Sequence, residues 1–144
     1  MASGWRGGWS CCRDSIGMCG YNIDICEVQW VSVRVFHFPK AADEVFMEGY
    51  VSQPVQPWQI PYRALTPRAG ECENLLVQVC ASMSTVAYAS FRIEPGYTIA
   101  GDAAGVAATQ AVHAKQAVQD IDVPALQKRL RELGQVIEWT TAAP

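Results

Sequence analysis

The chain has 144 residues, half of them hydrophobic and 17% charged, with a formal net charge of −3. This composition excludes an intrinsically disordered chain, and the length is sufficient for one domain with a buried core. The 11 Lys and Arg residues are scattered along the chain, so no nucleic-acid or anionic-membrane partner is expected.

Targeting and metal signals are missing from the sequence. The most apolar stretches, 75–91 and 97–112, are interrupted by polar residues, and the first ten residues lack the apolar core of a secretory signal. A soluble, cytoplasmic chain is therefore predicted. The six cysteines match no zinc spacing and are expected to be reduced thiols, with a cysteine-based metal protein as a remote alternative.

The first half of the chain predicts β-structure. Residues 1–20 are rich in glycine and have no period, which predicts an irregular lead. Residues 23–38 are rich in Val and aromatics and predict one long strand or a pair of strands, and 46–52 predict another short strand. Residues 53–68 contain four prolines and are expected to form an extended loop.

The second half alternates one strand with helices. Residues 74–80 (NLLVQVC) have the length and apolar character of a buried parallel strand. Residues 83–92 predict a short helix that ends at the Glu-Pro-Gly sequence of 94–96. An alanine-rich helix is expected from near Gly101 to about Val118.

The last helix has the clearest local signals. Asp122 is a helix-capping residue type, Pro124 suits a first helical turn, and Gly134 suits the end, so 123–133 is predicted as a helix. One face of this helix and its extension carries an apolar stripe: Leu126, Leu130, Leu133 and Ile137.

The segment 97–112 (YTIAGDAAGVAATQAV) is the most informative about function. A helix opening at Gly101 has almost no side chains on the face formed by Gly101, Gly105 and Ala108, so a flat ligand or another backbone could approach closely. A helix start also presents free N–H groups and a positive dipole end, while Asp102 could accept from ligand hydroxyls. The alternative is a helix that merely packs tightly on a sheet, with Asp102 as its cap.

A longer succession of motifs favours the ligand-facing interpretation of this helix. In order, the chain carries 60–67 (IPYRALTP), 73–77 (ENLLV), 80–82 (CAS), 87–95 (AYASFRIEP), 101–108 (GDAAGVAA) and 120–134 (DIDVPALQKRLRELG). This order, over roughly residues 15–138, resembles the C-terminal part of a family of FAD-dependent oxidoreductases with the two-part FAD fold of the glutathione reductase type.

The resemblance implies a FAD cofactor and a small organic substrate. It implies that 74–80 is a strand returning to the FAD domain and that the flavin lies near Cys80, Ser82 and a set of five helix residues: Gly101, Asp102, Ala103, Ala104 and Gly105. Two departures stand out. Relatives usually carry a neutral polar residue where this chain has Asp102, and no strand-GxGxxG-helix unit for the FAD pyrophosphate occurs in the sequence.

Three further residues are candidates for substrate binding: Arg92, Tyr62 and Arg63. For Arg92 a structural ion pair, with Glu94 as one partner, is the competing interpretation, and for Cys80 it is a buried inert thiol. No catalytic acid, base or nucleophile can be assigned from the sequence.

The predicted fold class is α+β: an antiparallel β portion, one buried strand and two C-terminal helices in an incomplete FAD-binding fold. The predicted organisation is an irregular lead (1–20), a β-rich part of a substrate domain with a proline-rich connection (21–68), a returning part of the FAD-binding domain (69–138) and a tail (139–144). The chain is expected to be inactive alone. The alternative is a non-enzymatic module that self-associates through exposed apolar faces.

Overall fold

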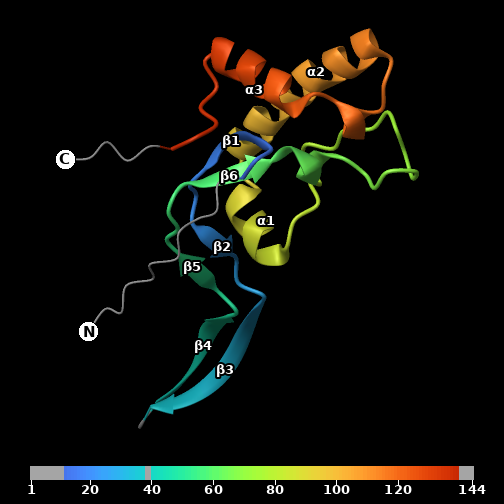
Figure 1. Ribbon diagram of the computed structural model, residues 1–144. Helices are drawn as coiled ribbons and strands as arrows, with labels where there is room; N and C mark the ends of the chain where they lie inside the picture. Colours follow the sequence, from blue (N-terminus) through green and yellow to red (C-terminus); the bar gives the residue numbers. More distant parts are fainter. Residues whose placement is uncertain (1–11, 38–39, 140–144) are drawn as a thin grey trace, which may run out of the picture.

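The computed structural model describes residues 12–37 and 40–139 (Figure 1). Within these residues the elements in chain order are β1 (Ser15–Cys19), β2 (Ile23–Ile25), β3 (Gln29–His37), β4 (Lys40–Glu48), β5 (Val51–Gln53), β6 (Trp58–Pro61), the 3-10 helix η1 (Tyr62–Leu65), α1 (Thr85–Phe91), α2 (Glu94–Ala114), the 3-10 helix η2 (Val118–Asp120) and α3 (Val123–Glu132). The α+β class predicted from the sequence is confirmed.

The six strands form one long antiparallel ribbon in three steps. β1 pairs with β6, β2 with β5 and β3 with β4, so the chain runs outward along three strands and returns along the other three (Figure 1). Gly49, between β4 and β5, has a φ of +84°, a backbone conformation that favours glycine. The ribbon carries the chain far from the helices and back.

The core lies where the inner end of the ribbon meets the helices. Ile16 and Ile60, from β1 and β6, are fully buried beside Leu126 and Leu130 of α3 and the alanines of α2. Hydrogen bonds also connect the ribbon to the helices at this point. The Ser15 hydroxyl donates to the carbonyl of Ile137 (2.6 Å), and the Gln127 side chain donates to the carbonyl of Ser15 (3.0 Å).

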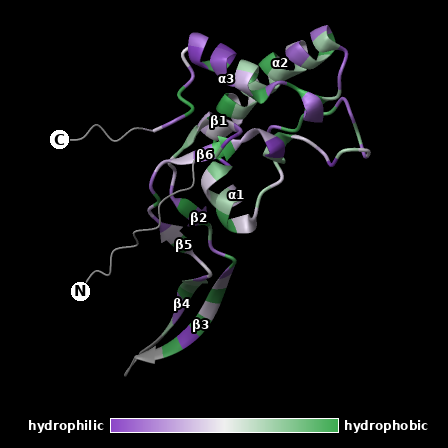
Figure 2. Ribbon diagram, in the orientation of Figure 1, coloured by the Kyte–Doolittle hydropathy of each residue, from purple (hydrophilic) through white to green (hydrophobic). Residues whose placement is uncertain are grey.

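The outer end of the ribbon, β3 with β4, is here called the arm. It projects away from the helical body (Figure 1), and hydrophobic residues alternate with hydrophilic ones along it without a covering layer (Figure 2). Large apolar side chains are exposed on it and at its base: Val28, Trp30, Val33, Val45, Phe46 and Met47. A two-stranded hairpin of this kind is at best marginally stable in water by itself.

The ribbon corrects three expectations and confirms one. The irregular lead expected over 1–20 contains β1, whose side chains are mostly buried, and the loop expected over 53–68 contains β6 and η1. Of the two alternatives for 23–38, two separate strands are found, β2 and β3, which pair with β5 and β4 rather than with each other. The single short strand expected over 46–52 is wrong, because Gly49, with its positive φ, separates the end of β4 from the start of β5.

Two other expectations are wrong. Residues 74–80 do not form a strand. Every strand that the structure describes pairs with another segment, and none of them pairs with 74–80, where Leu75 and Val79 are exposed. The alanine-rich helix begins at Glu94 rather than near Gly101, and it ends at Ala114. Pro95 lies in its first turn, where a missing N–H costs nothing, so the Glu-Pro-Gly sequence starts a helix instead of ending one.

The other two helices agree with the sequence. α1 lies within the expected 83–92, and α3 begins after Asp122, whose carboxylate accepts from the N–H of Ala125 (3.1 Å). Of the predicted apolar stripe, Leu126, Leu130 and Ile137 are buried, whereas Leu133 is 57% exposed. Among the described residues, no helix has both the length and the apolar character needed to cross a bilayer.

Candidate functional site

One face of α2 is open and nearly without side chains. The opposite face packs into the core through Ala100, Ala103, Ala107 and Ala111. A Cβ built on Gly101 or on Gly105 would meet no atom within 4 Å. The glycine spacing read from the sequence therefore does produce an accessible surface.

This face forms one wall of a hollow of about 790 Å³, here called the glycine hollow. The remaining walls come from β1 and from the segment that follows α3. Its lining residues are Met18, Ile99, Gly101, Asp102, Gly105, Val106, Leu133, Gly134, Gln135 and Val136. The lining is mainly apolar, and its single charged side chain is the exposed carboxylate of Asp102.

The electrostatics of this hollow differ from the expectation. Because α2 starts at Glu94, Gly101 lies about two turns inside the helix, and its N–H belongs to the helical hydrogen-bond ladder. Asp102 is likewise not the helix cap. The actual first turn is closed off, since a Cβ on Gly96 would overlap the carbonyl oxygen of Phe91. The α2 wall of the glycine hollow therefore offers neither free N–H groups nor the positive end of the helix dipole.

The other predicted cofactor residues are spread over several places. Ala103 is fully buried in the core, and Ala104 packs against that core while half-buried. Cys80 is exposed, so the alternative of a buried thiol is wrong. Ser82 is exposed and lines a second hollow of about 540 Å³ with Arg63, Cys12, Trp58 and Met83 among its walls.

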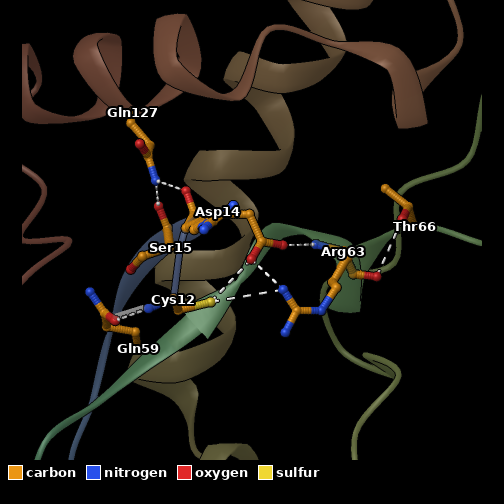
Figure 3. A network of polar contacts seen from close by, with 8 residues as sticks. Cys12, Asp14, Ser15, Gln59, Arg63, Thr66 and Gln127 are labelled. Carbon is orange, nitrogen blue, oxygen red and sulfur yellow. Dashed lines mark hydrogen bonds and ion pairs between the residues drawn. The ribbon is translucent and has the colours of Figure 1, made fainter. Parts of the chain in front are cut away.

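Arg63 belongs to a polar network at the start of β1 (Figure 3). Its guanidinium forms an ion pair with Asp14, and its backbone N–H donates to the same carboxylate (3.0 Å). The thiol of Cys12 also donates to Asp14 (3.1 Å). Asp14 and Cys12 are not among the residues predicted from the sequence, where the one available signal is a polar residue, Asp14, directly before the 15–19 run.

The network shifts two pKa values in opposite directions. Burial raises the pKa of the Cys12 thiol above 9.0, and the hydrogen bond to Asp14 and its charge raise it further, so Cys12 is a protonated donor at neutral pH. Burial also tends to raise the pKa of Asp14. The hydrogen bonds from Arg63 and Cys12 and the Arg63 charge outweigh that effect and hold it below 3.8.

Replacing Asp14 with asparagine is expected to lower the free energy of unfolding at pH 7 by about 1–2 kcal/mol, because charge-assisted bonds are lost. The pKa of Asp14 is depressed in the folded state, so its contribution is present above pH 3.8 and is lost as pH falls through the folded value. Urea unfolding at pH 7 and pH 3 measures this. The Asp43→Asn control, which breaks an exposed pair with Arg34, should change little at either pH; equal losses in both variants would contradict the expectation.

The remaining two substrate candidates have structural partners. Tyr62 is 3% exposed, and its hydroxyl donates to the carbonyl of Val118 (2.7 Å); burial raises its pKa to about 12. Arg92 forms an ion pair, as one interpretation held, but with Asp24 (3.1 Å) rather than with Glu94. It also donates to the carbonyl of Asp24 (3.0 Å) beside the thiol of Cys26.

The structure thus groups the predicted residues in separate places. Gly101, Asp102 and Gly105 share the glycine hollow, Arg63 and Ser82 share the second hollow, and no residue lines both. The ligand roles of these residues stay predictions. No group of three or more His, Cys, Asp or Glu side chains suited to a metal ion occurs among the described residues.

The structure is that of an α+β chain in which an open, small-residue face of α2 lines a mainly apolar hollow. The family model described as FAD dependent oxidoreductase matches residues 10–130, and the chain belongs to that family. No curated protein and no solved structure matches the chain.

The glycine hollow fits one part of FAD and not the other. Its small-residue wall and apolar surroundings suit a flat ring, and the carboxylate of Asp102 suits a sugar-alcohol hydroxyl, from which it would accept a hydrogen bond. The pyrophosphate needs cations or free backbone N–H groups. The described lining of the hollow contains no Lys or Arg, and its helical N–H groups are already bonded.

Proposed function

We propose that this chain is the part of a FAD-dependent oxidoreductase that lies against the flavin ring, through the open face of α2. The observation that carries the proposal is the pair of glycines, Gly101 and Gly105, whose missing side chains leave an unobstructed wall in a family member. FAD, when bound, supplies the oxidation or reduction of a small organic substrate. A cytoplasmic location is part of the same proposal.

The residues of the glycine hollow have separate roles in this proposal. Gly101 and Gly105 allow close approach of the ring, while Ile99, Val106 and Val136 exclude water from it. Asp102 accepts a hydrogen bond from a ribityl hydroxyl. Because the carboxylate would oppose negative charge on a reduced ring, its role is orientation rather than stabilisation of that charge. The phosphates would be held by other polypeptide, so the chain alone binds FAD weakly and does not turn over substrate.

Flavin titration tests this proposal directly. Fluorescence titrations with FAD and with riboflavin are expected to give the same weak affinity, about 1 mM or weaker, because the phosphates make no contact. Gly105→Leu fills the hollow and should abolish binding, whereas the control Val112→Leu, on the same helix but outside the hollow, should not. An affinity for FAD about 100-fold above that for riboflavin would show that the chain itself binds the phosphates, and equal binding by both variants would exclude the glycine hollow.

A second candidate function is association through the arm. The observation in its favour is the set of exposed apolar side chains on and beside β3 and β4, which no other described segment covers. Contiguous apolar surface of this kind is typical of protein interfaces. We propose that the arm mediates self-association, independently of any role in flavin binding.

A further inference from the structure

The two outer edges of the arm differ in charge. β3 contains one Asp, Glu, Lys or Arg residue, which is Arg34, and the carboxylate of Asp43 on β4 neutralises it (3.0 Å). β4 contains four such residues in nine: Lys40, Asp43, Glu44 and Glu48. Charged side chains on an edge strand discourage pairing with another chain. In the part of the chain that the structure describes, β3 pairs with β4 alone, so its outer edge is both open and almost free of charge.

We propose that β3 pairs, antiparallel and about a two-fold axis at Val33, with β3 of a second copy of this chain. In that register Val33 lies opposite itself, Val31 opposite Val35, and Ser32 opposite Arg34. These positions follow from the nine-residue strand Gln29–His37, whose midpoint is Val33. Apolar pairs meet across the new interface and no like charges are directly opposed, an arrangement that stabilises cross-strand pairing.

The same operation on β4 is unfavourable. The midpoint of Lys40–Glu48 is Glu44, so a symmetric β4 pair would set two carboxylates opposite one another. Pairing through β3 instead converts the two-stranded arm into a four-stranded sheet in the order β4–β3–β3–β4. Sheets of three or more strands with an apolar face reach a stability that an isolated hairpin lacks. This inference rests on the second candidate function, association through the arm.

The test is analytical ultracentrifugation of the full chain over a range of concentrations. The native chain is expected to form dimers. Val33→Lys places two lysines opposite each other and should raise the dimer dissociation constant by at least about tenfold. The matched control is Val112→Lys, an equal charge change at an exposed valine on α2, outside the arm, which should alter it by less than about threefold. Circular dichroism and thermal midpoints establish that both variants are folded.

A second pair of variants keeps the register testable if Val33→Lys does not fold. Ser32→Asp should tighten the dimer by facing Arg34 of the second copy, and Ser32→Lys should weaken it, with both effects reduced at high salt. Equal effects of the two Ser32 variants, or of Val33→Lys and Val112→Lys, would overturn pairing through β3 while leaving self-association intact. A native chain that is monomeric at every concentration would overturn both.

Discussion

Replacing Leu130 with alanine is expected to lower the free energy of unfolding by about 2–5 kcal/mol. Leu130 of α3 is fully buried and packs in the core formed by β1, β6 and α2. Truncation removes apolar contacts and leaves a cavity that a close-packed interior cannot readily fill. Urea unfolding followed by far-UV circular dichroism measures the loss.

Leu133 is the matched control because it lies one turn further along the same chain segment and is 57% exposed. Leu133→Ala should change the free energy of unfolding by about 0.5 kcal/mol or less. If the two variants lost equal stability, α3 would not be seated with Leu130 inward, and the glycine hollow that Leu133 and Gly134 help to line would have a different shape.

Replacing Gly96 with alanine is expected to lower the free energy of unfolding by about 3 kcal/mol. Gly96 lies in the first turn of α2, and an added Cβ would overlap the carbonyl oxygen of Phe91 and stand 3.3 Å from its ring. Backbone cannot move aside as a flexible side chain does, so α1 and α2 would have to separate. The ring of Phe91, which is fully buried and meets Tyr97 edge-on at 5.4 Å, would be displaced with them.

Gly101→Ala is the control for this effect, since it is the same change in the same helix at an open position. Alanine is the stronger helix former, so this variant should gain up to about 1 kcal/mol of stability. The two substitutions are therefore expected to differ in sign, and thermal unfolding of both variants measures this. A Gly96→Ala variant as stable as the native chain would contradict the close junction of α1 with α2.

Local signals determined how well each helix could be predicted. α3 was predicted almost to the residue because its cap, its first-turn proline and the glycine after it act within one turn. The start of α2 was missed because a Glu-Pro-Gly sequence suits both a turn and a first helical turn. The contact that requires Gly96 comes from Phe91, which no local rule includes.

Long-range pairing explains the other differences. β1 lies in a glycine-rich segment without a period, which predicts irregular structure; the strand forms because it pairs with β6, about 40 residues further along the chain. The apolar run 74–80 has strand composition but no strand beside it among the described residues. Isolated backbone hydrogen bonds hold this segment against the rest of the chain, such as the one from the N–H of Val77 to the carbonyl of Leu65 (2.8 Å). A strand needs a neighbour, and composition does not supply one.

The candidate site was also predictable only where local sequence determines it. The open face of α2 follows from the spacing of Gly101 and Gly105, a periodicity visible in the sequence alone. The ion pair of Asp14 with Arg63 and that of Asp24 with Arg92 each join residues that are distant in sequence, so they required the folded ribbon.

The nested strand pairs also bear on how the chain can fold. The β3–β4 hairpin closes the shortest loop, and once it has formed, β2 meets β5 across a span already shortened, and then β1 meets β6. If the strand pairs form from the tip inward, each step closes only a short additional loop, so the entropy lost at each step is small.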